Sequence, residues 1–165
     1  MQTTFPTVPQ VEQLPLYHRE TISEKHLDVM GHLNIRWYMA LFDEGAWHFF
    51  STFGMDQDYY ENQQGGGFAL QQFVRYLAEV RVGETITIRI RMLARSSKRI
   101  QFMSFMVNET TGKLAATLES LGAHADMTIR RTAPYPDHIA TKIDAIIDNQ
   151  NQLGWDAPVC GVIKP

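Results

Sequence analysis

NIRWYMALFDEGAWHFFSTF, residues 34–53, is the segment around which the remainder of the chain can be arranged. Its apolar residues recur at alternating spacings of four and three, which predicts an α-helix with one apolar face. This face consists of Ile35, Met39, Phe42, Ala46, Phe49 and Phe53. Asn34 suits the N-cap position, and Gly54 suits the end of the helix. A helix that is apolar over most of its girth has to be covered by other elements.

Strand patterns lie on both sides of this helix. TITIRIRML, residues 85–93, alternates isoleucine and methionine with threonine and arginine, as expected for a strand with one buried face. Further strands are predicted at residues 16–23, 68–77, 99–107 and 114–129. Their short connections favour an antiparallel meander. The predicted fold class is therefore α+β, with a curved antiparallel sheet wrapped around one long central helix.

The length of 165 residues suits a single domain, within which three parts are expected. Residues 1–13 carry two prolines among polar residues and are expected to form a flexible N-terminal arm. Residues 14–136 hold the helix and the strands. Residues 137–165 are expected to form an extra C-terminal helix, at 137–148, and a tail that packs on the same domain. QGGG, residues 64–67, is predicted to be a loop.

The composition argues against several classes of function. The formal net charge is −3, so no basic field indicates a nucleic-acid partner. No apolar run reaches membrane-spanning length, and the first residues lack the basic and apolar regions of a secretory signal. Cys160 is the only cysteine, which leaves no intrachain disulfide and no CxxC motif. We therefore expect a soluble cytoplasmic protein without a nucleic-acid or membrane partner.

HLDVMGHLN, residues 26–34, places an acid, a Gly-His pair and an asparagine where a loop is expected to meet the helix. Gly31 allows the backbone to turn closely past a ligand. A metal site at His26, Asp28 and His32 is not favoured, because their spacing matches no strong zinc pattern. The segment is instead typical of a turn that brings a carboxylate to the positive end of a helix.

Together with residues further along the chain, this turn resembles the hotdog-fold acyl-CoA thioesterases of the 4-hydroxybenzoyl-CoA thioesterase type. The resemblance rests on D-x-x-G-H-x-N-x-x-x-Y, on YLAEVRVGE and on the strand series that ends in ADMTIRRTAPYP. The residues that carry it are Asp28, Gly31, His32, Asn34, Tyr38, Tyr76, Gly83 and Glu84. It covers residues 14–136, about three-quarters of the chain.

The resemblance implies a hotdog fold, a homodimer or homotetramer, and hydrolysis of an acyl-CoA to the free acid and CoA. It also implies that Asp28 is the catalytic carboxylate. Coenzyme A enters as part of the substrate, and no cofactor is expected. The chain departs from the family in its C-terminal extension. It also departs in Ile35-Arg36-Trp37, where many relatives carry small or polar residues.

A thioester can be hydrolysed without a Ser-His-Asp triad, given a carboxylate and donors for the developing oxyanion. Asp28 is expected to attack directly or to activate water. Backbone amides at the start of the helix are expected to hold the thioester oxygen, helped by His32 or Asn34. Asn34 suits a structural role as the N-cap equally well. Glu44, on the polar side of the helix, is the fallback carboxylate, although a solvated position explains it better.

The acyl pocket is expected to involve the helix, the turn before it and the glycine-rich segment after it. The expected substrate-binding residues are Gly31, Trp37, Tyr38, Glu44, Gly67 and Phe68. Four aromatic residues outside the apolar helix face also predict an aromatic wall, suited to a flat aryl group or a small cationic acyl group. These four are Trp37, Trp47, Tyr59 and Tyr60.

Basic residues are expected where the phosphates of coenzyme A enter. Arg95, Lys98 and Arg99 flank a predicted turn and are expected to contact those phosphates as charge-assisted donors. An ordinary solvated turn explains the same three residues equally well.

Two other functions are compatible with these residues. An acyl-ACP thioesterase would share the chemistry but accept a carrier protein. A non-catalytic protein of the same fold would bind acyl-CoA without cleaving it. The absence of a GxSxG motif disfavours an α/β-hydrolase route.

Overall fold

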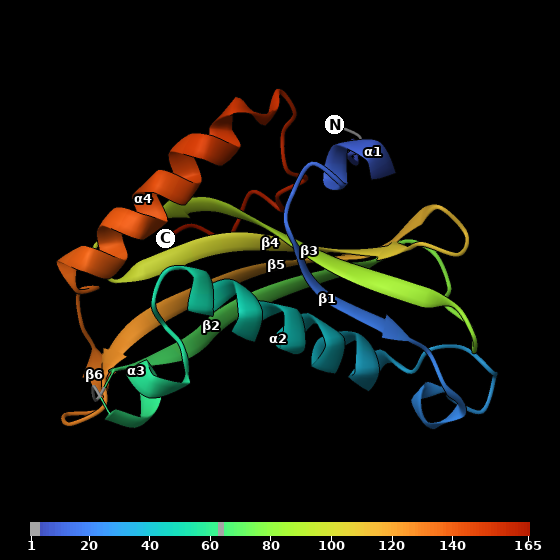
Figure 1. Cartoon of the computed structure of the whole chain (residues 1–165), viewed down its shortest axis with the longest axis horizontal. Coiled ribbons are helices and arrows are strands. Elements are labelled where there is room, and N and C mark those ends of the chain that lie inside the picture. Colours follow the sequence, from blue (N-terminus) through green and yellow to red (C-terminus); the bar gives the residue numbers. More distant parts are fainter. Residues whose placement is uncertain (1–3, 63–64) are drawn as a thin grey trace.

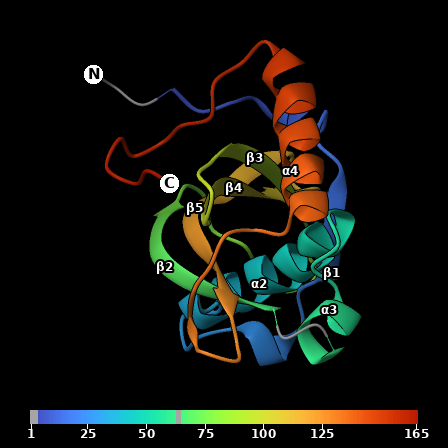
Figure 2. The same cartoon turned by 90° about the vertical axis from the view of Figure 1, so that its left-hand side faces the viewer.

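A single antiparallel sheet and one long helix dominate the computed structural model, which describes residues 4–62 and 65–165 (Figure 1). The helices and strands are α1 Val8–Val11, β1 Leu16–Thr21, η1 Glu24–His26, α2 Ile35–Thr52, α3 Gln57–Asn62, β2 Gly65–Tyr76, β3 Thr85–Arg95, β4 Arg99–Asn108, β5 Lys113–Asp126, β6 Arg131–Thr132, α4 Asp137–Gln150 and η2 Asn151–Leu153. Figure 2 shows the sheet curving around α2, with α4 beside it. The predicted sheet, central helix and extra C-terminal helix are therefore confirmed.

The helix predicted at residues 34–53 is confirmed as α2. Asn34 caps it, because its side-chain oxygen accepts a hydrogen bond from the Arg36 amide at 3.1 Å. The prediction is wrong for Ile35, whose side chain is 67% exposed because the described part of the chain leaves the first turn of α2 uncovered. The buried face is otherwise wider than predicted and also includes Tyr38, Leu41 and Gly45.

The order of the strands differs from the predicted meander. The sheet order is β1-β3-β4-β5-β2, so that only β3, β4 and β5 follow one another. The reason is that α2 separates β1 from β2 in the chain and runs along the sheet, so these two strands occupy opposite edges. The last long strand also ends earlier than predicted, at Asp126, because a turn leads from there into β6, which pairs back onto β5.

Glycines mark the places where elements approach one another most closely. A Cβ on Gly45 would lie 2.5 Å from Cγ2 of Ile88, so α2 rests directly on β3. A Cβ on Gly65 would lie 2.1 Å from the Tyr59 ring, and one on Gly66 would lie 2.5 Å from Sδ of Met127. Real Cβ atoms do not fit at such distances.

The loop predicted at residues 64–67 is therefore wrong for Gly65–Gly67, which are the first residues of β2. They pair in register with Asp126–His124 of β5. These glycines serve close packing within a strand and do not form a turn. Gln64 lies outside the described residues.

Both faces of the central strands β3, β4 and β5 are largely covered, whereas the alternation in residues 85–93 predicts one solvated face. Arg91 is only 7% exposed, and its guanidinium donates to the carbonyls of Trp155 at 2.5 Å and Gln150 at 3.3 Å. Burial lowers the pKa of Arg91. The segment after α4 thus supplies a polar and aromatic cover that strand periodicity alone does not reveal.

The N-terminal arm predicted at residues 1–13 is also ordered in part. Residues 8–11 form α1, and the buried side chains of Val11 and Leu14 pack with Phe105 and Trp155. Val11 and Leu14 are about one helical turn apart, so their side chains face the same way and can be buried together. The predicted arm thus contains one short packed helix, while residues 1–3 lie outside the described part of the chain.

Candidate functional site

The segment before α2 forms a closed turn. The Asp28 amide donates to the His32 carbonyl at 2.8 Å, and the Gly31 amide donates to the Asp28 carbonyl at 3.1 Å. Gly31 has a φ of 81°, a conformation that glycine adopts without strain. The geometric role predicted for Gly31 is therefore to close this turn.

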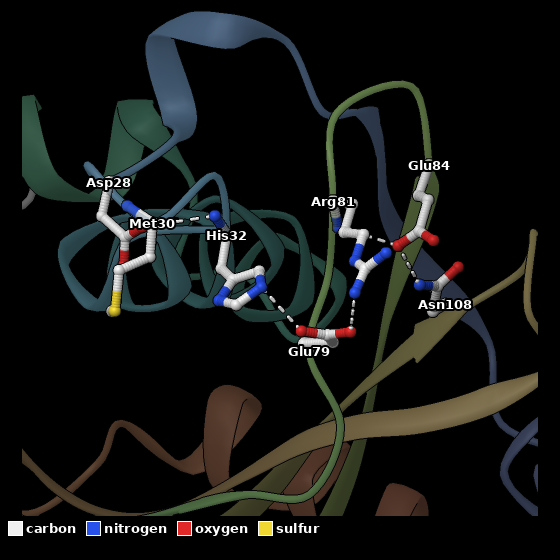
Figure 3. Close-up of polar contacts among 7 residues, drawn as sticks. All are labelled: Asp28, Met30, His32, Glu79, Arg81, Glu84 and Asn108. Atoms are coloured by element: carbon white, nitrogen blue, oxygen red, sulfur yellow. Dashed lines mark hydrogen bonds and ion pairs between the residues drawn. The ribbon is translucent and has the colours of Figure 1, made fainter.

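The carboxylate of Asp28 is held by the backbone of the same turn (Figure 3). Its Oδ1 accepts hydrogen bonds from the amides of Met30 at 2.8 Å and His32 at 3.2 Å. Within residues 4–62 and 65–165, no hydrogen bond or ion pair engages Oδ2. One oxygen is thus anchored, and the other is available to a ligand immediately before the N-terminus of α2.

The imidazole of His32 points away from Asp28 and toward the segment that follows β2 (Figure 3). Its Nε2 lies 2.7 Å from Oε2 of Glu79, and the other oxygen of Glu79 lies 2.5 Å from Nη2 of Arg81. Glu84 extends this chain of contacts by accepting from the Arg81 amide at 2.8 Å and from Nδ2 of Asn108 at 2.7 Å. His32 therefore supports Asp28 through its backbone amide, while its ring is committed to Glu79.

Few amides at the start of α2 remain open for an oxyanion. The Arg36 amide donates to the Asn34 side chain, and the Trp37 amide donates to the Asn34 carbonyl at 2.9 Å. The Ile35 amide has no acceptor among the described residues. It is the donor that the helix start offers to a thioester oxygen.

The three residues weighed for a metal site have separate partners. Nδ1 of His26 faces the amide and hydroxyl of Ser23, at 2.9 and 3.1 Å, whereas His32 pairs with Glu79. Within the described residues, no group of three or more His, Cys, Asp or Glu side chains is arranged to hold a metal ion.

A cavity of about 130 Å³ lies between α2 and the strands β2, β4 and β5. Its lining is mostly apolar and includes Gly67 and Phe68, two of the residues predicted from the sequence to bind the substrate. Asp43 contributes a carboxylate from α2. Asp28, His32 and Asn34 do not line this cavity. Asp43 follows Asn34 by roughly 14 Å along the helix axis, so the cavity and the Asp28 turn lie at different levels of α2.

The mouth of the cavity adjoins a shallower depression lined by aromatic residues. Asp43, Phe50 and Tyr60 line both, and Trp47 lines the depression. The rings of Trp47 and Tyr60 meet edge to face, with centroids 5.1 Å apart. Burial, and secondarily the neighbouring Tyr59, raises the pKa of Tyr60 to about 12, so its hydroxyl stays neutral near pH 7.

Two of the four aromatic residues predicted to form a wall line neither the cavity nor the depression. Trp37 packs edge-on against His26, with ring centroids 4.6 Å apart, and lies outside the cavity lining. Tyr59 is buried, and its hydroxyl lies 2.6 Å from Nε2 of His124. Trp37 lies away from Trp47 because the two residues are nearly three helical turns apart on α2.

Two further residues expected at the substrate also lie outside the cavity. Tyr38 is buried against Tyr76, with ring centroids 5.0 Å apart, and burial is the main cause that raises its pKa to about 12. Glu44 is exposed, one residue after Asp43, which is the acid that does line the cavity. Asp43, Trp47 and Phe50, spaced by four and three residues, are the signal that would have identified this stripe.

The three basic residues expected at coenzyme A are placed differently from one another. Nε and Nη2 of Arg95 are both 2.5 Å from the carboxylate of Asp144, so Arg95 ties β3 to α4. This bidentate pair lowers the pKa of Asp144 and raises that of Arg95. Lys98 and Arg99 are exposed in the β3–β4 hairpin. Nη1 of Arg95, which makes only a 3.4 Å contact with the Ser96 carbonyl, is the part of this guanidinium left for a phosphate.

Residues 23–143 match the model of the Thioesterase-like superfamily, and the chain belongs to that superfamily. Its architecture is the hotdog fold, and the superfamily is named for thioesterases. Among the helices of the described residues, none is long and apolar enough to cross a membrane.

Curated relatives within this class are named for one type of thioester. An L-carnitine dehydrogenase/betainyl-CoA thioesterase from Rhizobium meliloti is 25% identical over 80% of this chain and 26% of its own length. The chain thus spans about a quarter of the length of the dehydrogenase/thioesterase relatives that it matches. A betainyl-CoA thioesterase from Pseudomonas aeruginosa is 22% identical over 77% of this chain and 80% of its own.

A solved structure supports the fold independently. A hypothetical protein from Staphylococcus aureus, in complex with CoA, superimposes with a TM-score of 0.82 at 23% identity. The match covers 92% of this chain and 96% of that chain. A match over 92% of the chain takes in at least part of the segment beyond residue 136, which is therefore not confined to this sequence.

Proposed function

We propose that this protein is an acyl-CoA thioesterase in which Asp28 supplies the catalytic carboxylate. The observation that carries the proposal is the D-x-x-G-H-x-N turn, in which Oδ1 is anchored by two amides and Oδ2 has no partner among the described residues. The turn lies at the positive end of α2, which favours negative charge there. Membership in the Thioesterase-like superfamily supports the same reaction.

The reaction requires one carboxylate and one oxyanion donor. In the water route, Asp28 takes a proton from water as the resulting hydroxide adds to the thioester carbon. In the covalent route, Oδ2 of Asp28 attacks that carbon, and water then cleaves the anhydride. The Ile35 amide stabilises the oxyanion in both routes. Collapse of the intermediate breaks the carbon–sulfur bond and releases CoA as a thiolate.

The acyl group is proposed to be short. A cavity of about 130 Å³ is slightly smaller than the roughly 150 Å³ cavity that accommodates one benzene molecule, so a compact head group fits and a long straight chain does not. Relatives named as betainyl-CoA thioesterases support a trimethylammonium head group on a short acyl chain.

A second copy of the chain is proposed to complete the site. The outer edge of β2 has no partner strand among the described residues, and Leu70, Phe73 and Tyr76 are 40–51% exposed along it. Tyr76 lies near the start of α2 through its contact with Tyr38, whereas Gly65 is at the mouth of the cavity. Antiparallel two-fold pairing of β2 with its copy would bring the Asp28 turn of one protomer to the cavity mouth of the other.

Light scattering tests this assembly directly. We expect a mass of about 38 kDa, twice the 18.9 kDa of one chain, or a multiple of that pair.

Complementation between two inactive variants tests whether the site is shared. Gly67→Leu should fill the cavity, because the nearest atoms to a Cβ there are 3.8 Å away and leave room for a side chain. When Gly67→Leu and Asp28→Asn chains are mixed in equal amounts and reassembled, about half of the dimers contain one chain of each kind. Each of these dimers has one intact site of two, so about a quarter of wild-type activity should return. A monomeric active enzyme, or failed complementation between two dimeric variants, would contradict the shared site.

A panel of thioesters tests the proposed function. Betainyl-, benzoyl- and palmitoyl-CoA, with betainyl-ACP as the carrier control, are compared by release of free thiol to DTNB. The kcat/KM for betainyl-CoA should exceed that for palmitoyl-CoA by at least about tenfold, because the longer chain cannot enter the cavity. Binding of every CoA ester without thiol release would overturn the enzymatic assignment, and preference for the ACP ester would change the carrier.

A further inference from the structure

One carboxylate and three aromatic side chains border the cavity mouth. Asp43, Trp47 and Phe50 are four and three residues apart on α2, so they form one stripe along the helix. Tyr60 of α3 closes the opposite side, with its ring edge to face against Trp47. Figure 1 shows α3 and the start of β2 beside the C-terminal half of α2, where this stripe lies.

The carboxylate of Asp43 has no basic partner among the described residues. Across residues 4–62 and 65–165, no hydrogen bond or ion pair joins the Asp43 side chain to another residue. Asp43 is exposed at the cavity mouth, so its hydrated carboxylate attracts an arriving cation by a Coulomb interaction that solvent and salt partly screen. A neutral aryl group could stack on the rings but would lack the charge–charge attraction to Asp43 that a cation gains.

Two hydroxyl groups inside the same cavity also have no partner. Ser104 of β4 is fully buried and Ser120 of β5 is 4% exposed, and both line the cavity. Neither Oγ has a hydrogen-bond partner among the described residues. Buried hydroxyls in native proteins are normally paired, so these two are open to water or to a ligand that brings polarised groups into the cavity. The methyl groups of a trimethylammonium ion carry part of its positive charge and suit hydroxyl oxygens.

We propose that Asp43, Trp47 and Tyr60 form a recognition site for an ammonium group on the acyl portion of the substrate. The inference rests on the proposed thioesterase function and assigns Asp43 to specificity, separate from the catalytic role of Asp28. The rings of Trp47 and Tyr60 attract the cation through their π faces, as in aromatic cages for quaternary ammonium ligands. Asp43 supplies the net negative charge that the cage alone lacks.

Two thioesters of the same shape isolate the contribution of charge. Betainyl-CoA and tert-butylacetyl-CoA differ only in that a quaternary carbon replaces the ammonium nitrogen. For Asp43→Asn, we expect the ratio of their kcat/KM values to fall about tenfold relative to wild type, mainly through a higher KM for betainyl-CoA. Asp148→Asn makes the same chemical change at an exposed position on α4 and should leave the ratio unchanged.

A binding measurement separates this inference from the enzymatic proposal. Calorimetry with glycine betaine and tert-butylacetate, which share the carboxylate, should show tighter binding of the cationic ligand to wild type and loss of that preference in Asp43→Asn. Turnover of both esters without charge preference would overturn the ammonium site and leave the thioesterase intact. Equal loss of both esters in Asp43→Asn would instead make Asp43 part of the catalytic machinery. If neither ester is turned over but wild type still binds glycine betaine more tightly than tert-butylacetate, only the thioesterase assignment is overturned.

Discussion

Asp28→Asn is expected to lower kcat about a thousandfold while leaving the fold intact. A positioned general base or nucleophile contributes about 10²–10⁴ to rate, and asparagine can perform neither role at neutral pH. The amide oxygen of asparagine can still accept the hydrogen bonds that Met30 and His32 donate to Oδ1. The substitution therefore removes the chemistry of Oδ2 and preserves the anchoring of the turn.

Steady-state kinetics with betainyl-CoA, together with thermal unfolding, measures both parts of this expectation. Asp28→Ala is the matched comparison, because it removes the chemistry and the two anchoring hydrogen bonds together. It should lose activity to a similar extent and also unfold at a lower temperature, since each such bond contributes about 1 kcal/mol. Near-normal kcat in a well-folded Asp28→Asn enzyme would refute the role assigned to this carboxylate.

Phe49→Ala is expected to lower the free energy of unfolding by about 3–5 kcal/mol, the range for removing a buried phenylalanine ring. Phe49 is fully buried at the centre of an aromatic cluster in which α2 meets β1 and β4. Its ring centroid lies 5.2 Å from that of Tyr17 and 5.9 Å from that of Phe102. The substitution therefore leaves a cavity where the helix joins the sheet.

Urea unfolding followed by circular dichroism gives this free energy, and calorimetry should show a fall in Tm of roughly 6–20 °C. Ile129→Ala is the control, because Ile129 is 63% exposed in the turn between β5 and β6, away from the proposed β2 interface. It should cost about 0.5 kcal/mol or less. Equal losses for the two variants would mean that Phe49 is not central to the core.

Local sequence patterns are sufficient to predict the central helix and the turn that holds Asp28. The spacing of Phe42, Ala46 and Phe49 identifies α2, since helical periodicity depends only on residues a few positions apart. The Asp28 turn is equally local: Gly31 closes it, and backbone amides within four residues hold the carboxylate. The prediction that Asn34 caps the helix is confirmed for the same reason.

Contacts between distant segments explain what the sequence analysis missed. Gly65 and Gly66 have the composition of a loop, yet they are strand residues because Tyr59 and Met127 leave no space for a Cβ. Arg91 belongs to the polar side of an alternating strand, yet it is buried because Trp155 and Gln150 supply its acceptors. Arg95 flanks a predicted turn, and the sequence does not reveal that Asp144 on α4 pairs with it. Each outcome depends on a partner more than thirty residues away or on a neighbouring element.

The amino-acid sequence alone thus establishes a central helix, an antiparallel sheet and a carboxylate presented at the helix start, because periodicity and turn chemistry act over short distances. The strand order, the cover on the outer face and the separation of Asp28 from the cavity depend on how the chain closes on itself. Asp43 shows most clearly the difference between what sequence patterns and what tertiary packing determine. In the sequence it is one of two adjacent acids on α2, and only the packing of β2 and α3 against the helix makes it the acid at the cavity mouth.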